Sequence, residues 1–283
     1  MPVTHSPLRY PGGKSQLAPF VLDLIQANDL YKGIYAEPFA GGAGIAWHML
    51  LTGHMSEVWI NDLDPAIHAF WFSVLHHGEA LCERIQETPI TIDEWRHQRT
   101  VLADPAASTL DLGFATLFLN RTNRSGILKA GVIGGVNQDG DYKLDCRFNT
   151  VEIVRKIKRI SQYRSVIRLS RLDAAECLRQ WDKALPPRAL INIDPPYYAQ
   201  GKALYLNYYK PDDHANLADV VRALKHPWMV TYDEEPAIEQ LYAGLPQYKN
   251  SLVYYVQVKR RANELMYLSH NLNAPHSLQP LAA

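Results

Sequence analysis

Apolar and polar positions near the start of the chain follow a pattern typical of α/β proteins. A short apolar run over 33–39 ends in a glycine-rich turn, and 45–51 then continues with helical periodicity. The apolar run 58–65 ends in acidic residues, and its last residue, Pro65, can open a helix over 66–75. This beginning predicts the order strand, helix, strand, helix.

The middle of the chain has helical patterns and no clear strand. Five glycines between 122 and 149 interrupt any regular element there. We therefore expect an insertion over 66–152 that is helical first and loop-rich second. Its further helices are expected at 80–86, 93–103 and 110–121.

Strands alternate with helices again after the insertion. The expected strands are 166–169, 189–193, 229–232, 251–256 and 265–268, and the expected helices are 174–181, 214–224 and 236–242. Such alternation predicts a parallel sheet with helices on its faces and an antiparallel edge near the end. The fold class is α/β, with a Rossmann-like sheet domain made of 1–65 and 153–283 and a mainly helical insertion of 66–152. Lys259 to Arg261 are expected at a turn between the last two strands.

Composition narrows the class of protein. Of the 283 residues 47% are hydrophobic and 20% are charged, and no apolar run approaches the roughly 20 residues that cross a bilayer. The start lacks the plan of a secretory signal peptide. Three distant cysteines, Cys82, Cys146 and Cys177, suit neither a disulfide framework nor a metal knuckle, and the histidines lack ligand spacing. We expect a cytoplasmic, monomeric protein without a metal.

Charge is distributed unevenly along the chain although the net charge is zero. Residues 121–164 hold ten Lys and Arg against four Asp and Glu, so the remainder is acidic. Contact between one face and phosphates requires such an asymmetry. A solvated basic helix over 151–164 explains the same charges equally well.

The segment Asp194-Pro195-Pro196-Tyr197 is the most informative, because it follows an apolar run and so lies at the carboxyl end of an expected strand. Two prolines remove two backbone donors and leave carbonyls beside a carboxylate and an aromatic ring. A carboxylate and a proline carbonyl are two acceptors that can hold the amino group of an aromatic base, on which Tyr197 can stack. The alternative is a plain turn after a strand.

A second candidate site follows the first two strands. The loop that contains Glu37, Phe39 and Gly41 is placed for a nucleotide-type ligand, and Asp62 can accept hydrogen bonds from both ribose hydroxyls. We interpret this as a site for an adenosine cofactor. In a dinucleotide fingerprint the third glycine would fall on Trp47, which is too bulky, so a hydride-transfer enzyme is disfavoured.

The N-terminal segment is similar to the end of a phosphate-binding loop, but the first glycine of that motif would fall on Leu8 and no strand precedes it. We interpret Tyr10 and Lys14 as cofactor contacts, with the ring against the cofactor and the ammonium toward its carboxylate. A solvated N-terminal turn is an equally good interpretation of these residues alone.

Taken in order, these segments resemble the Dam-like family of D12-class DNA adenine methyltransferases. Its members carry an aromatic-x-Gly-Gly-Lys segment, a Glu-Pro-Phe-x-Gly loop, an Asp after the second strand, and Asp-Pro-Pro-Tyr. The matches here are 10–14, 37–41, Asp62 and 194–197, which span nearly the whole chain. The family usually has Trp at the position of Tyr10, so the aromatic surface is kept.

The resemblance implies a methyltransferase that uses S-adenosylmethionine (SAM). It implies direct transfer of the methyl group, without a covalent enzyme intermediate, to the N6 amino group of an adenine flipped out of double-stranded DNA. The catalytic segment would be Asp194 to Tyr197. The residues that would contact or line the cofactor site are Tyr10, Lys14, Glu37, Phe39, Gly41, Asp62, Asp173 and Asp194.

By the same resemblance the insertion is a DNA target-recognition domain. Its segment 118–126 is similar to the family's Leu-Asn-Arg segment, which precedes a base-contacting hairpin. Arg suits guanine and Asn suits adenine, so base or phosphate contacts are expected there, whereas Asn120 fits a structural role. The candidates are Arg121, Asn123, Arg124 and Lys129. A restriction–modification system is one setting for such an enzyme.

The same residues also bear on other activities. Methylation of a cytosine ring carbon needs a thiolate, typically after proline, and no cysteine here follows a proline, which excludes that reaction. Methylation of the cytosine amino group uses the same acceptors, although those enzymes more often have Ser in place of Asp194. Methylation of RNA or of a glutamine side chain, and a DNA-binding module that retains SAM as a sensed ligand, stay open as well.

Overall fold

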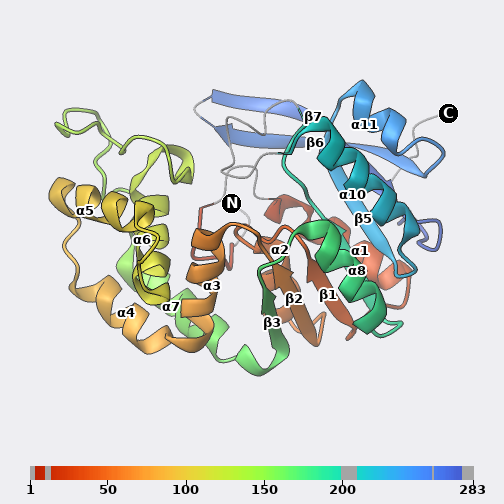
Figure 1. Ribbon diagram of the computed structural model, residues 1–283, viewed down its shortest axis with the longest axis horizontal. Helices are drawn as coiled ribbons and strands as arrows, with labels where there is room; N and C mark the ends of the chain where they lie inside the picture. The colour runs from red at the N-terminus through yellow and green to blue at the C-terminus, as the bar shows by residue number, and fades with distance from the viewer. Residues whose placement is uncertain (1–3, 10–13, 199–208, 257, 276–283) are drawn as a thin grey trace. The chain divides into compact units, whose positions relative to one another are not determined.

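The computed structural model describes residues 4–9, 14–198, 209–256 and 258–275. They form two compact units (Figure 1). The sheet unit comprises the described residues of Lys14–Leu63 and Val166–Ala283, and the helical unit comprises those of Val3–Gly13 and Asp64–Ser165. Among the described helices, none combines the length and apolarity needed to cross a membrane.

The sheet unit contains seven strands in the order β3-β2-β1-β4-β5-β7-β6. The first five are parallel, and β7 is antiparallel to both β5 and β6. This Rossmann-like order confirms the predicted α/β class and the antiparallel edge. The strands are β1 (Ile34–Glu37), β2 (Glu57–Asn61), β3 (Ile167–Ser170), β4 (Ala189–Ile193), β5 (Trp228–Asp233), β6 (Gln247–Val256) and β7 (Val258–Leu268). The helices are η1 (Ser15–Leu17), α1 (Ala18–Ala27), α2 (Gly44–Leu51), α8 (Ala174–Ala184), α10 (Pro211–Ala223) and α11 (Pro236–Leu241).

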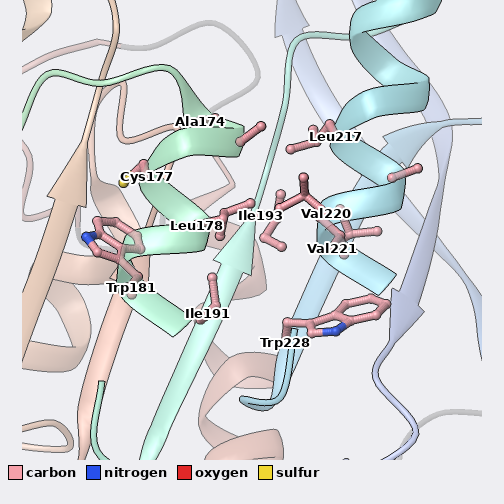
Figure 2. Packing of buried hydrophobic residues seen from close by; sticks show 14 of the residues in the cluster. Ala174, Cys177, Leu178, Trp181, Ile191, Ile193, Leu217, Val220, Val221 and Trp228 are labelled. Carbon is pink, nitrogen blue, oxygen red and sulfur yellow. The ribbon is translucent and has the colours of Figure 1, made fainter. Parts of the chain in front are cut away.

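One face of the sheet carries an apolar cluster in which α8 and α10 pack against β4 (Figure 2). Helix α8 begins at Asp173, whose carboxylate accepts hydrogen bonds from the N–H groups of Ala175 and Glu176 and so caps the helix. Its apolar side chains recur every three or four residues and therefore face the strands. Figure 2 shows Cys177, Leu178 and Trp181 of α8 with Ile191, Ile193, Leu217, Val220, Val221 and Trp228.

Helix α6 (Thr109–Thr122) forms the centre of the helical unit and is buried over most of its length. It packs against α3 (Pro65–His76) and α5 (Ile92–Ala103), while α7 (Thr150–Ser161) packs against α3 and α4 (Gly78–Glu87). Four of these helices are preceded by side chains that accept a backbone N–H, those of Asp64, Thr91, Ser108 and Asn149. A short turn, η2 (Arg124–Gly126), follows α6.

The helical unit differs from the expected insertion at its boundaries. It extends to Ser165 rather than to position 152, because the apolar side of α7 packs on α3 and α4. It also contains residues 4–9, whose backbone is held by α6 and α7. Asn120 accepts from the N–H of Arg9 at 2.7 Å and donates to its carbonyl at 2.6 Å, and Lys156 donates to the carbonyl of Ser6 at 3.3 Å.

The expectation of a turn at Lys259 to Arg261 is wrong. These residues lie within β7, where Lys259 pairs with Tyr255 and Arg260 pairs with Tyr254. The antiparallel hairpin is longer than the apolar pattern indicates. Residues 258–263 of β7 pair with β6 alone, because the pairing of β7 with β5 ends at Glu264 and Asp233. A stretch that is paired on one side only tolerates charged residues.

Candidate functional site

Polar residues of the sheet unit gather on the face opposite the apolar cluster, at the carboxyl ends of the parallel strands. Side chains alternate along a strand, so Ile191 and Ile193 join the cluster while Asn192 and Asp194 fall on the other face. The same alternation applies to Glu37 on β1 and Thr231 on β5. Strand alternation and order thus bring these groups to one edge, where ligands bind in such folds.

Lys14 lies at the centre of this group and its side chain is 5% exposed. Its ammonium donates to Asp194 Oδ1 at 2.6 Å and to Thr231 Oγ1 at 2.9 Å, and lies 3.1 Å from Glu264 Oε1. An ammonium has three donors, and three acceptors of the sheet unit therefore satisfy it. Burial alone would lower the pKa of Lys14, but the carboxylates of Asp194 and Glu264 raise it, so Lys14 is a permanent cation here.

The Asp194 carboxylate is oriented through one of its two oxygens. Oδ1 accepts from Lys14 and also from the hydroxyl of Thr231 at 3.0 Å. The described residues provide no donor to Oδ2, and 31% of the Asp194 side chain is exposed. Oδ2 is therefore the oxygen of this half-buried carboxylate that is left to accept a further hydrogen bond.

Tyr197 is held beside this carboxylate. Its hydroxyl donates to Glu264 Oε1 at 2.8 Å, and the Lys14 ammonium lies over its ring at 5.4 Å from the centroid. The next residue, Tyr198, donates its backbone N–H to Asp233 Oδ1 at 2.9 Å. The segment that begins at Asp194 and ends at Tyr198 is therefore attached to strands of the sheet at both of its ends. Pro195 and Pro196, between Asp194 and Tyr197, are buried.

Glu37 is a second buried carboxyl group at this edge. Burial, and then the charge of the neighbouring Asp194, raise the pKa of Glu37 to about 8, although a hydrogen bond from the backbone of Ala46 acts in the opposite direction. Glu37 is therefore mostly protonated at neutral pH. Perturbed carboxyl groups of this kind concentrate at functional sites.

Asp62, which follows β2, holds the glycine-rich turn after β1 through Gly41. Gly41 has a φ of 46°, and its N–H donates to Asp62 Oδ2 at 2.8 Å. Asn61, which is fully buried at the end of β2, donates to the carbonyls of Pro38 and Leu172, each at 3.0 Å. The side-chain oxygen of Asn61 accepts from the N–H of Leu172 at 2.9 Å. Asn61 thus ties the loops after β1 and β3 to the end of β2, a role that sequence reasoning missed.

Phe39 and Tyr209 form an aromatic wall near Asp173. The two ring centroids are 5.7 Å apart in an edge-to-face arrangement. Burial and the charges of Asp173 and Asp213 raise the pKa of Tyr209, so its hydroxyl stays neutral. Sequence reasoning missed Tyr209, because no strand or motif precedes it. Asp173 has a structural role as the cap of α8.

The side chains at this edge fit SAM. The positively charged methionine part of SAM suits carboxyl groups such as Glu37 and Asp194, and the ribose suits Asp62. The adenine of SAM suits an aromatic surface such as that of Phe39 and Tyr209. Tyr10, which was expected to contact the cofactor, lies outside the described residues. Among the residues that the structure describes, no group of three or more His, Cys, Asp or Glu could hold a metal ion.

The expected DNA contacts lie in the helical unit and differ in exposure. Arg124 and Lys129 are exposed. Arg121 is partly buried and donates to the carbonyls of Pro7 at 2.7 Å and Arg147 at 3.3 Å. Asn123 is fully buried, which corrects the expectation that its side chain contacts DNA.

The side chain of Asn123 is occupied by hydrogen bonds within the unit. Its oxygen accepts from Trp95 Nε1 at 2.7 Å, and its amide donates to the carbonyls of Ile127 at 3.1 Å and Leu128 at 2.9 Å. Such a group shapes the loop and has no free edge for a base. The sequence pattern could not reveal this, because two of its partners follow it closely in a loop without periodicity.

Three arginines of the helical unit lie close to one another. Burial and the charge of Arg147 lower the pKa of Arg9. Burial and the charge of Arg9 lower the pKa of Arg121 to about 10, against a smaller effect of Glu152. We call Arg9, Arg121 and Arg147 the arginine cluster. Sequence reasoning found only Arg121, because Arg9 lies far from the basic segment.

A family profile described as "D12 class N6 adenine-specific DNA methyltransferase" matches residues 10–261. The chain belongs to this family. The match confirms the resemblance drawn from the four motifs, and with it a methyltransferase that uses SAM as methyl donor. No curated protein matches the chain significantly.

Solved structures of distant methyltransferases are similar to this chain. The rRNA methyltransferase aviRa from Streptomyces viridochromogenes is 14% identical, with 90% of this chain and 83% of that chain covered and a TM-score of 0.40. TrmN from Thermus thermophilus is 12% identical, with 94% and 49% covered and a TM-score of 0.38. A SAM-dependent methyltransferase from Agrobacterium tumefaciens is 9% identical, with 90% and 61% covered and a TM-score of 0.39. At these scores the likenesses carry no argument about substrate or site.

Proposed function

We propose that this methyltransferase acts on specific sites in double-stranded DNA and methylates the N6 amino group of an adenine flipped out of the helix. The observation that carries the proposal is the orientation of Asp194. Lys14 and Thr231 hold Oδ1, no described residue donates a hydrogen bond to Oδ2, and the two prolines and Tyr197 follow Asp194 directly in the chain. An acceptor in this setting suits an aromatic amino group.

The chain's own residues would orient the amine. Asp194 Oδ2 and the carbonyl of Pro195 accept its two hydrogens, which draws the nitrogen toward a tetrahedral, nucleophilic geometry. The Tyr197 ring stacks on the extruded base and fixes its plane. Bound SAM supplies an electrophilic methyl group. Catalysis rests on alignment of the nitrogen with that methyl, and Asp194 Oδ2 is placed to take the proton that the methylated nitrogen gives up.

The cofactor contacts follow from the positions of the candidate residues. We propose that Asp62 binds the ribose, that Phe39 and Tyr209 line the adenine pocket with Asp173 at its edge, and that Tyr10, Glu37 and Gly41 complete the site. Lys14 serves the site through Asp194. Direct contact of its ammonium with the SAM carboxylate requires it to release one of its three present acceptors.

We propose that the helical unit, with the expected domain 66–152 at its centre, recognises the DNA target. Arg124 and Lys129 are exposed and available for phosphates or base edges. The arginine cluster adds positive charge that a phosphate backbone would neutralise. Methylation within a restriction–modification system is one biological setting for such site-specific activity.

The test is a methyl-transfer assay with labelled SAM on unmethylated duplex DNA, followed by nucleoside analysis and modification-aware sequencing. We expect N6-methyladenine at one short motif. Label in the cytosine amino group would replace the proposed substrate, and SAM binding without label in DNA would direct the search to RNA, protein or a sensing role.

Asp194→Asn provides the matched variant for this assay. It keeps the size of the side chain but replaces the charged acceptor, and we expect methylation to fall on the order of 10²–10³-fold with SAM and DNA still bound. Asp219→Asn, at an exposed position of α10, is the control and should leave the rate unchanged.

A further inference from the structure

Glu264 lies on β7, far along the chain from the motifs that identify the family, yet it contacts two of them. The residue is 2% exposed. Its Oε1 accepts from the Tyr197 hydroxyl at 2.8 Å and lies 3.1 Å from the Lys14 ammonium. One carboxylate thus joins the first motif to the catalytic segment.

The register of the sheet explains how Glu264 reaches this place. Because β7 is antiparallel to β5, Glu264 pairs with Asp233, the last residue of β5. Asp233 accepts from the backbone N–H of Tyr198 at 2.9 Å, and Glu264 accepts from the side chain of Tyr197. A single pair of facing residues therefore holds Tyr197, the last residue of the catalytic segment, and Tyr198, which follows it.

We infer that Glu264 is a positioning residue for methyl transfer, which fixes the Tyr197 ring and the Lys14–Asp194 pair relative to each other. The inference rests on the proposed adenine methylation. If the base stacks on Tyr197 while its amine bonds Asp194, the two contacts must be aligned with each other, and Glu264 links the groups that provide them.

Charge balance does not explain Glu264. Asp194 already neutralises Lys14, and a second buried carboxylate costs free energy unless its hydrogen bonds repay it. The contact that distinguishes Glu264 from Asp194 is the one with the Tyr197 hydroxyl. Stacking on a base needs only the ring of a tyrosine, so this hydroxyl serves to orient it.

A double-mutant cycle tests the inference on the full-length protein. Tyr197→Phe removes the hydroxyl and keeps the ring, and Glu264→Gln keeps the size of the side chain but weakens both contacts. We expect Tyr197→Phe to lower kcat about tenfold in the native background and less than about twofold in the Glu264→Gln background, because contacting residues couple. KM for SAM should stay within about twofold of the native value in all three variants.

The controls separate positioning from folding and from function. Glu239→Gln, exposed on α11, should leave kcat unchanged. If Glu264→Gln fails to fold, Glu264→Asp keeps the charge and withdraws it from Tyr197, and should give the same loss of coupling. Equal effects of Tyr197→Phe in both backgrounds, or no effect in the native one, overturn the inference. A native protein that forms no N6-methyladenine instead overturns the proposed function.

Discussion

Lys14 in the sheet unit and Arg121 in the helical unit are both cations withdrawn from solvent, but their surroundings differ. Lys14 contacts two carboxylates and a hydroxyl, and its pKa is raised. Arg121 donates to backbone carbonyls, and burial together with the charge of Arg9 lowers its pKa to about 10. The first cation is balanced within the protein, whereas the second lies beside another cation.

This difference indicates which kind of ligand suits each unit. A balanced, buried network holds its acceptors in place and suits a neutral amine that must be oriented. Clustered cations repel one another, and a polyanion relieves that repulsion. This difference is the one expected if the sheet unit transfers the methyl group and the helical unit binds DNA, as we propose. Substitutions of single residues test the two roles separately.

The largest expected effect follows from removing Lys14. Lys14→Met leaves Asp194 and Glu264 without their cation, and we expect the free energy of unfolding to fall by about 3–5 kcal/mol in urea titration. Arg147→Gln, at an exposed position of the arginine cluster, removes a repelled cation and should change stability by less than about 0.5 kcal/mol. Equal losses in the two variants would contradict the comparison.

Within the helical unit, buried Asn123 contrasts with the exposed candidate DNA contacts, because its side chain bonds only to the fold. Asn123→Ala removes three hydrogen bonds and leaves the indole N–H of Trp95 buried without its acceptor. We expect a loss of about 1–3 kcal/mol of stability, with the methylated motif unchanged. Thermal unfolding and sequencing of the methylated DNA measure the two quantities. A changed motif with unchanged stability would restore Asn123 as a base contact.

Glu37 differs from Lys14 because its charged form is not balanced. The neighbouring Asp194 is also a carboxyl group, and its negative charge disfavours a second negative charge on Glu37. With its pKa at about 8, Glu37 is mostly protonated below that pH. Cationic SAM beside it favours the carboxylate, so binding releases a proton. Affinity for SAM should rise with pH by up to about tenfold per unit until pH 8 and then level off. Calorimetric titration of Glu37→Gln, in which this rise should be absent, provides the control.

The smallest expected effects concern the exposed cations of the helical unit. Arg124→Gln and Lys129→Gln should each weaken DNA binding at all sequences and reduce the slope of log affinity against log salt by about 1, if they contact phosphate. Anisotropy titrations at several salt concentrations measure the slope. An altered sequence preference with the same slope would instead assign the residue to base recognition.

Periodicity and motifs predicted most of the sheet unit. All seven strands and the helices α2, α8, α10 and α11 lie where the sequence analysis expected them, within a few residues except at the terminal hairpin. Helix α1 was not predicted, although Val21, Leu24 and Ile25 have helical spacing. The terminal hairpin was predicted too short, because charged residues such as Lys259 to Arg261 fit a strand that is paired on one side only as well as they fit a turn.

The sequence by itself determined the family and the candidate site residues. The order of its motifs identified the family, and the motifs contain Asp194, Lys14 and Asp62. Only the tertiary structure decided which of these groups work together. Lys14, Asp194, Thr231 and Glu264 meet because strand order and an antiparallel register bring distant positions to one edge. The structure also decided that Asn123 lies inside the helical unit and that Asn61 joins the loops after β1 and β3 to the end of β2. Burial and hydrogen-bond partners depend on contacts across the fold, which no local pattern contains.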